Sequence, residues 1–438
     1  MPTIITIHQT ITAPSEPTWL DKITSSYRLS IRPASGPAND KCTDPYALPG
    51  FLNVNTTHVS ENRWVPMDEE CHAPRMFEAL RRGPSAVSEE DGGGWGDMNW
   101  ARNRTVVVFG DSVARENIAY FCELIGAKLD RITWDHPYAP SPRPTQTPPP
   151  LAWHQSSSGS TTFATPEDPD ADPELVRDWK PKPAPGEGDH AHLAHVCFVE
   201  EWGLLLVQQF QYGMDQEDPV YIPPGTFEAR LHTLLHPIVQ HAIDALQPSN
   251  PSADLVMLNS AFWDTARWVR EDMRFGRDLD AGLTRERLDW YRARVRQAVV
   301  AVSEVLLFAD LLQRRNADIT GSVHVPATAN GPSDWFTAGI QAQGAAKNDP
   351  KPGNTVLRLT ELDAAARSAF TIPPCHADCT PQQSQAHDVL RSVRINEWGR
   401  MMLGQEKHMK DALHQRLVPG GRLWADMMLF DLWRAVRT

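Results

Sequence analysis

A short apolar run that ends in a tight turn limits the possible folds of this chain more than any other feature. Residues 105–109 read Thr-Val-Val-Val-Phe, without polar alternation, which is typical of a strand buried on both faces. Gly110, Asp111 and Ser112 follow, and from residue 113 to residue 129 apolar side chains recur at helical spacing. A buried strand, a tight turn and a helix make up half of a βαβ unit, so the chain is predicted to fold around a parallel sheet.

Other runs of the same kind predict further strands. Residues 254–258 and 393–396 are buried-strand candidates, residues 196–210 suit a strand or hairpin, and residues 322–325 suit a short strand. Helical spacing predicts helices at 227–246, 284–314, 362–370, 398–407 and 423–436. Strands that alternate with helices indicate an α/β fold in which helices sandwich a mainly parallel sheet as three layers.

Composition divides the chain further. Residues 1–40 lack periodicity and are expected to form a flexible lead-in. Residues from about 138 to 187 are rich in Pro, Ser, Asp and Gly, which bury too little apolar surface to offset the entropy of ordering. We therefore expect a disordered insert there, inside a single domain that spans 41–438 and begins with an irregular segment.

Charge and hydropathy exclude two classes of partner. The net charge is −13, and Lys and Arg are not clustered, so no nucleic-acid partner is expected. No apolar run reaches the roughly 18–20 residues that span a bilayer. The N-terminal residues have neither the basic nor the apolar region of a signal peptide, so the chain as printed is expected to be soluble.

Cysteines and glycosylation motifs bear on the compartment. Six cysteines permit three disulfides, and Cys42 and Cys71 are expected to lie close together because both belong to the irregular segment. Asn55 and Asn103 each begin an Asn-x-Thr motif typical of a glycoprotein. These features favour the secretory pathway, in the Golgi lumen or outside the cell, whereas the lack of a signal peptide favours the cytoplasm. Both compartments stay open.

Ser112 is the candidate nucleophile. Reactive groups in an open parallel sheet gather at the carboxyl ends of strands, and Ser112 stands at such an end, where helix amides stabilise negative charge. A serine hydroxyl needs a base, and near the C-terminus His414 follows Asp411 by three residues. A carboxylate at this spacing can reach the imidazole in a turn and fix its tautomer.

Asn259 is a third candidate. It follows the run at 254–258, so its amide is expected at the same edge of the sheet as an oxyanion donor. Taken singly, each motif is more often structural: an Asn after a strand is usually a turn former. Their combination, in this order along the chain, favours a catalytic site.

This order of motifs resembles the SGNH/GDSL hydrolase superfamily. It is most similar to the polysaccharide O-acetylation branch, the trichome-birefringence-like O-acetyltransferases and the related PC-esterase domain. The resemblance spans roughly 42–130 and 250–436. The matching segments are residues 63–66 (Arg-Trp-Val-Pro), 71–75 (Cys-His-Ala-Pro-Arg), 108–115 (Val-Phe-Gly-Asp-Ser-Val-Ala-Arg), Cys122 and 411–414 (Asp-Ala-Leu-His).

The resemblance implies a serine-dependent reaction without a cofactor. Ser112 would form an acyl-enzyme, with His414 as base and Asp411 as its partner. The expected substrate is a carbohydrate or polysaccharide that carries O-acetyl groups, together with an acetyl donor if the chain is a transferase. Water and a sugar hydroxyl use the same base, so hydrolysis and transfer both stay open.

The resemblance also implies two further contacts. A glycine is expected to supply a second oxyanion donor, and Gly203 and Gly213 are both candidates. Arg115, three positions after the serine, is expected either to bind a carboxylate of the substrate or to cap neighbouring structure. The α/β-hydrolase alternative is disfavoured, because its Gly-x-Ser-x-Gly motif would need glycine where the chain has Ala114.

Two other readings belong to different functional classes. The first is a catalytically silent carbohydrate-binding or scaffold protein that keeps the SGNH fold. The second is a metal enzyme that uses Cys375, His376 and Cys379, or pairs His408 with His414. The first cluster is explained more simply by a disulfide-bearing loop, and His414 is already employed in the second, so no metal is expected.

Overall fold

A computed structural model describes the greater part of the chain. The described residues are 42–55, 57–84, 98–141, 152–155, 161–164, 193–214, 227–247, 250, 252–306, 322–326, 356–371, 379–402, 405–411 and 414–437. The chain divides into two compact units, Met1–Thr43 and Asp44–Thr438, and the fold below is that of the second. The lead-in at 1–40 and most of the insert at 138–187 lie outside the described residues. Within the insert, β5 (Ala152–Gln155) and β6 (Thr161–Ala164) pair as an antiparallel hairpin, so the insert is not irregular throughout.

The core of this unit is a seven-stranded sheet. Its strands lie in the order β11-β10-β9-β3-β8-β7-β4. The strand bounds are β3 Thr105–Gly110, β4 Leu129–Ile132, β7 Ala194–Val199, β8 Leu204–Phe210, β9 Leu255–Leu258, β10 Ser322–Pro326 and β11 Arg394–Asn396. The five strands from β11 to β8 are parallel, while β7 and β4 add antiparallel pairs at one edge. The prediction that 105–109, 254–258 and 393–396 share one mainly parallel sheet is confirmed.

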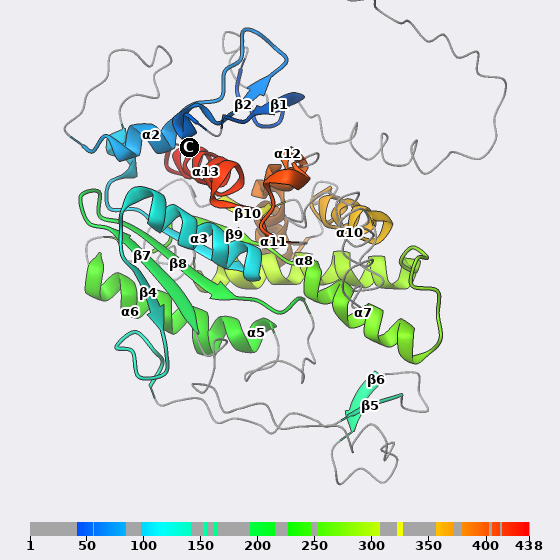
Figure 1. Ribbon diagram of the computed structural model, residues 1–438. Coiled ribbons are helices and arrows are strands. Elements are labelled where there is room, and N and C mark those ends of the chain that lie inside the picture. Colours follow the sequence, from blue (N-terminus) through cyan, green and yellow to red (C-terminus); the bar gives the residue numbers. More distant parts are fainter. Residues whose placement is uncertain are drawn as a thin grey trace, which may run out of the picture. The chain divides into compact units, whose positions relative to one another are not determined.

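Both faces of the sheet are covered by helices, which explains the unbroken apolar character of β3. All six residues of β3 are buried. Val106 and Val108 pack with α2 (Met76–Arg81), α3 (Ser112–Ile125) and α13 (Arg422–Arg437). Val107 and Phe109 pack on the opposite face with α6 (His236–Leu246), α8 (Arg285–Leu306) and α10 (Val356–Ala369). The result is the α/β arrangement of a sheet between helices that the sequence predicts (Figure 1).

The helix after Ser112 is shorter than predicted. The pattern extended it to residue 129, but α3 ends at Ile125 because Gly126 adopts a left-handed conformation (φ 75°) and its N–H caps the last turn. The apolar residue at position 129 begins the edge strand β4 instead. Apolar spacing alone did not separate the end of the helix from the start of the strand.

Several other elements differ from the prediction. The helix expected at 398–407 is only α12 (Trp398–Met401), followed by the short 3₁₀ turn Glu406–His408. Helices α7 (Phe262–Arg274) and α11 (Pro381–Ser392) were not predicted. Buried positions of α7 include Asp264, Thr265 and Asp272, so the helix is amphipathic but poor in apolar residues.

The N-terminal part of the unit is irregular apart from a hairpin. Strands β1 (Gly50–Asn53) and β2 (Arg63–Pro66) pair antiparallel outside the main sheet.

A disulfide between Cys122 and Cys197 joins α3 to β7, with Cα atoms 5.9 Å apart. Cys42, Cys71 and Cys379 are also disulfide-bonded. The closeness of Cys42 to Cys71 stays a prediction.

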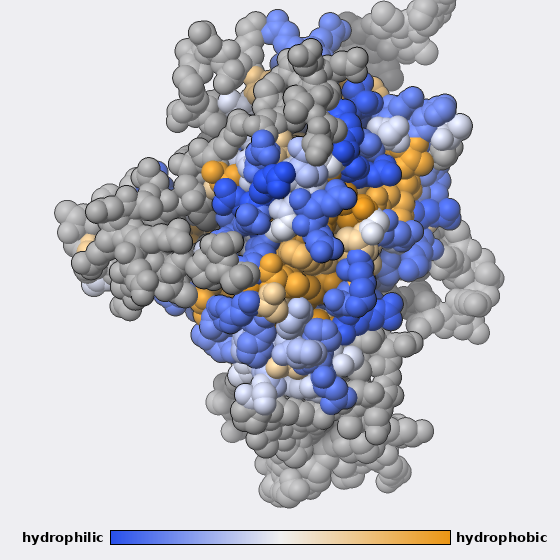
Figure 2. Space-filling view, turned by 90° about the vertical axis from the view of Figure 1, so that its left-hand side faces the viewer, coloured by the Kyte–Doolittle hydropathy of each residue, from blue (hydrophilic) through white to orange (hydrophobic). Residues whose placement is uncertain are grey.

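The disulfides fit an oxidising compartment. Within the described part of the chain, no helix combines the length and apolarity that crossing a membrane requires. On the side of the molecule that carries β4 and α6, hydrophobic residues form a strip between hydrophilic ones (Figure 2). This side contains the edge of the sheet, where its apolar faces approach the surface.

Candidate active site

The sheet topology brings the ends of β3 and β9 together. The two strands are parallel neighbours, with Phe109 opposite Leu258, so Ser112 and Asn259 both follow strands at the same edge. After β3 the chain forms β4, β7 and β8 on one side of β3 and then crosses to β9 on the other side. Such a reversal of strand order is where open α/β sheets bind ligands.

Gly110 allows the end of β9 to pack tightly against the serine turn. A Cβ atom on Gly110 would lie 2.7 Å from the Cβ of Ala114 and 3.0 Å from that of Asn259. The backbone N–H of Asn259 donates to the carbonyl of Phe109 at 2.9 Å. The side-chain amide of Asn259, on a residue only 5% exposed, makes no hydrogen bond to another described residue. Asn259 therefore lies beside the turn with its amide available for a ligand.

The backbone just after Asn259 is strained. Ala261 is fully buried and has a φ of 123°, a conformation that L-residues rarely adopt. Strained residues of this kind persist only when the surrounding structure holds them, and they cluster at functional sites. This strain marks the end of β9 as part of the same candidate site.

Ser112, His414 and Asp411 come together as the sequence predicts. The Nε2 atom of His414 lies 2.8 Å from the Ser112 hydroxyl oxygen, across 302 positions of sequence. The Nδ1 atom lies 2.9 and 3.0 Å from the two carboxylate oxygens of Asp411. His408 occupies a different place: its Nε2 atom is buried without a hydrogen-bond partner among the described residues. The geometry is that of a serine, a base and an orienting carboxylate.

Side chains of α3 hold the histidine segment, and sequence reasoning missed them. Gln415 donates from its side-chain amide to Asn117 at 2.6 Å, and its carbonyl accepts from the Tyr120 hydroxyl at 3.1 Å. Lys410, on the other side of the histidine, pairs with Glu116 at 3.0 Å. The same helix that begins at the serine therefore anchors both flanks of the base.

Asp111 fixes where α3 begins. Its carboxylate accepts the backbone N–H of Val113 at 2.9 Å and thereby caps the helix. Burial raises the pKa of Asp111, while these amides and the nearby His414 act in the opposite direction. The cap places Ser112 in the first turn, where the unpaired amides of the helix favour negative charge.

The structure separates the two candidate glycines. Gly213 follows β8 at the carboxyl edge, near Gln211, whose N–H donates to the Gly110 carbonyl at 2.8 Å. Gly203 precedes β8, and a Cβ there would meet the side chain of Asn103 at the amino end of β3. Gly203 is therefore excluded as an oxyanion donor, because the whole length of β3 separates it from Ser112. Only the strand register could show this.

A polar network holds the loop that contains Gly213. Asp264 accepts the N–H of Met214 at 2.8 Å and also the hydroxyl of Ser260. Gln211 accepts from the buried Arg230 at 2.9 Å and donates to the carbonyl of Gly213. These residues connect the segment after β8 to the segment after β9, and the sequence analysis did not identify them.

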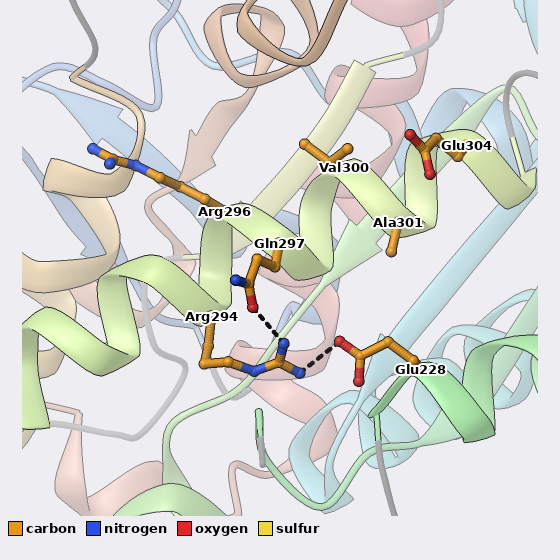
Figure 3. A pocket seen from close by; sticks show the side chains of 7 residues that line it. All are labelled: Glu228, Arg294, Arg296, Gln297, Val300, Ala301 and Glu304. Atoms are coloured by element: carbon orange, nitrogen blue, oxygen red, sulfur yellow. Dashed lines mark hydrogen bonds and ion pairs between the residues drawn. The ribbon is translucent and has the colours of Figure 1, made fainter. Parts of the chain in front are cut away.

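A hollow on another part of the surface is not the candidate site. It has a volume of about 460 Å³ and lies along α8 and the start of α5 (Phe227–Arg230). Within it, the Arg294 guanidinium is held between Gln297 and Glu228 at 2.6 and 2.7 Å (Figure 3). Its lining contains none of the predicted site residues, and Arg294 already has protein partners.

The metal alternatives find no support in this geometry. Both ring nitrogens of His414 face other groups, so His414 is not placed to share a metal ion with His408. Cys379 is disulfide-bonded, and Cys375 and His376 lie outside the described residues.

Comparison with known proteins identifies no relative: neither protein-family models nor curated proteins match the chain.

Proposed function

We propose that this chain is a serine-dependent O-acyl esterase or O-acyltransferase of the SGNH type, acting on O-acetyl groups of carbohydrates. The observation that carries the proposal is the 2.8 Å contact between His414 and Ser112, with Asp411 on the other ring nitrogen. Nothing local brings residues 302 positions apart into this arrangement, which matches the requirements of nucleophilic catalysis.

The strand order supports the SGNH assignment. Numbered along the chain, the parallel strands β3, β8, β9, β10 and β11 lie in the order 2-1-3-4-5, the order of flavodoxin-like sheets. The serine follows the first strand, the asparagine follows the third, and the Asp-x-x-His segment precedes the last helix. This placement agrees with what the sequence resemblance implies.

The reaction follows from the positions of the groups. His414 takes the Ser112 proton as the hydroxyl oxygen attacks the ester carbonyl, and Asp411 stabilises the resulting imidazolium. Asn259 and the N–H groups of Ser112 and Gly213 are the proposed donors to the oxyanion. The imidazolium then protonates the departing sugar oxygen and leaves an acyl-enzyme. Water or a second hydroxyl, deprotonated by the same histidine, releases the acyl group.

We place this chemistry in the secretory pathway, in the Golgi lumen or outside the cell. The Cys122–Cys197 disulfide and the other bonded cysteines support this placement. Asn103, which begins one Asn-x-Thr motif, is exposed. Its left-handed conformation (φ 54°) also suits an asparagine that forms a turn, so the disulfides carry the argument.

Covalent labelling tests the proposal. The purified full chain is treated with a fluorophosphonate probe, and the labelled peptide is identified by mass spectrometry. We expect label on Ser112 and none in Ser112→Ala or His414→Ala. Release of acetate from an acetylated oligosaccharide, measured with and without an acceptor sugar, then distinguishes esterase from transferase. A folded protein whose Ser112 stays unlabelled while other hydroxyls react would refute the proposal.

A further inference from the structure

Arg115 is a cationic side chain that lies beside the proposed nucleophile. It stands one helical turn after Ser112, and its guanidinium carbon lies 5.5 Å from the ring centre of Phe210. The residue is half-buried, yet it makes no ion pair and no side-chain hydrogen bond with another residue in the described ranges. Among the described residues it therefore caps no neighbouring structure, which was one of the two roles predicted for it.

Five other half-buried or buried arginines of this protein are paired with carboxylates. The pairs, all at 2.6 to 2.8 Å, are Arg104–Asp254, Arg287–Asp272, Arg294–Glu228, Arg367–Glu397 and Arg422–Glu78. A partly desolvated cation gains most when an anion meets it, and Arg is the side chain that best matches a carboxylate. Arg115 differs from these five arginines, and it lies at the edge of the sheet where a substrate would bind.

Aromatic rings extend from Arg115 along the same edge. Phe210 pairs with Gly110 at the end of β8, and its ring lies 4.5 Å from that of Tyr212. Tyr212 lies 5.2 Å from Trp263, which comes from the segment after β9. All three rings are half-buried, so each retains exposed apolar surface. Aromatic faces of this kind suit the C–H faces of a sugar ring.

Building on the proposed function, we propose that the substrate is an acidic sugar. Its carboxylate pairs with Arg115, and its ring packs against the aromatic group Phe210, Tyr212 and Trp263. The net charge of −13 disfavours a densely charged polyanion, so recognition depends on one local carboxylate rather than on a long-range field. The ester that Ser112 attacks would then be an O-acetyl group on that sugar or on its neighbour.

Matched substrates test the proposal. The O-acetylated methyl glucuronoside and the O-acetylated methyl glucoside differ only at the carboxylate. We expect the full chain to prefer the acidic ester at least about 10-fold in kcat/KM, and Arg115→Gln to reduce the ratio about 10- to 100-fold, mainly through KM. Arg115→Lys should restore part of the ratio, because lysine keeps the charge but not the fork of donors.

Arg102→Gln is the matched control. Arg102 also stacks on an aromatic ring at 5.5 Å, that of Trp202, but at the opposite end of the sheet. Arg102→Gln should leave the ratio of kcat/KM for the acidic ester to kcat/KM for the neutral ester unchanged. A wild-type ratio near 1, or a ratio that Arg115→Gln does not alter, would overturn the acidic-sugar inference.

A binding measurement keeps this outcome separate from a failure of the proposed function. Methyl glucuronoside and methyl glucoside are titrated into Ser112→Ala and into Ser112→Ala/Arg115→Gln by calorimetry. We expect the acidic sugar to bind more tightly to the first protein only. Equal binding of the two sugars overturns the inference, whereas a lack of fluorophosphonate label on wild-type Ser112 overturns the proposed function alone.

Discussion

The two ends of the central strand β3 carry similar residue types but pair them differently. At the amino end, Asp254 accepts from both Arg104 and the N–H of Thr105 at 2.8 Å, and the hydroxyl of Thr105 donates to Gln247 at 2.7 Å. Asn250 also donates to Asp254. Each of these polar groups has a protein partner, so this end of the sheet is built for stability.

At the carboxyl end, polar groups are oriented but left available. The hydroxyl of Ser112 bonds to His414, while the amide of Asn259 and the guanidinium of Arg115 make no hydrogen bond with the described residues. Ala261 adds a strained backbone. The two ends therefore differ in how their polar groups are satisfied: partners within the protein satisfy the groups at the amino end, whereas the proposed reacting groups at the carboxyl end are open to a ligand.

The largest expected effect breaks the reacting pair itself. Ser112→Ala and His414→Ala should each lower kcat/KM by about 10⁴–10⁶-fold, because the two residues act as a unit. Asp411→Asn should cost less, about 10²–10⁴-fold, since the Asp411 side chain is 49% exposed and water replaces part of its effect. Hydrolysis of an acetyl ester measures all three. A loss of kcat/KM below about tenfold in folded Ser112→Ala would mean that the carboxyl end of β3 does not carry the catalytic serine.

Asparagines at the two ends provide the next test. Asn259→Ala should lower kcat by about 10²–10³-fold with little change in KM, because the amide is needed in the transition state. Asn250→Ala, at the amino end, removes hydrogen bonds to Asn103 and Asp254 and should affect stability instead. Steady-state kinetics and thermal unfolding of both variants distinguish these outcomes. Equal kinetic losses would show that Asn259 is not an oxyanion donor.

A glycine near each end of β3, Gly213 and Gly203, provides a third test. Gly213 (φ 98°) and Gly203 (φ 60°) both have positive φ, so alanine at either position should lower the free energy of unfolding by about 1–2 kcal/mol. An alanine Cβ would also crowd Asp264 at position 213 and Asn103 at position 203. Only Gly213→Ala should lower kcat, by about 10–10³-fold, through a displaced donor. Turnover measured on the folded fraction checks this, and a comparable loss in Gly203→Ala would contradict it.

The smallest effect on activity is expected from Asp254→Asn. The variant removes the carboxylate that pairs with Arg104, which should lower the free energy of unfolding by about 1–3 kcal/mol. Because the residue lies at the far end of the strand, kcat/KM should change by less than about threefold. Denaturant unfolding and ester hydrolysis provide the two readouts. A large catalytic loss without destabilisation would mean that the two ends are coupled.

Part of the fold could be predicted from the sequence because a strand buried on both faces is a continuous apolar run. The runs at 105–109 and 254–258 are buried on both faces and contain no polar alternation. Helix α7 is amphipathic but poor in apolar residues, because its buried positions include Asp264 and Asp272, whose partners Met214 and Arg287 lie elsewhere in the chain. A polar residue in a core is predictable only once its partner is known.

The candidate site likewise contains contacts that the sequence predicts and contacts that it does not. Asp411 and His414 are three residues apart, so a turn suffices to bring carboxylate and imidazole together, and the backbone N–H of His414 also donates to Asp411 at 2.8 Å. The contact of Gln415 with Asn117 spans 298 positions and has no sequence signature of its own. Local spacing therefore identified the groups, but not what holds them in place.

The residue pattern alone establishes the buried strands, the turn at Ser112 and the pairing of Asp411 with His414, because each depends on neighbours along the chain. The assembled sheet establishes the rest: His414 meets Ser112, Gly213 rather than Gly203 lies at the site, and Arg115 forms no ion pair with a described residue. These outcomes depend on strand order and register, which are settled by packing between segments hundreds of residues apart. The free energy of packing between distant segments depends on the whole fold, so no short stretch of sequence determines it.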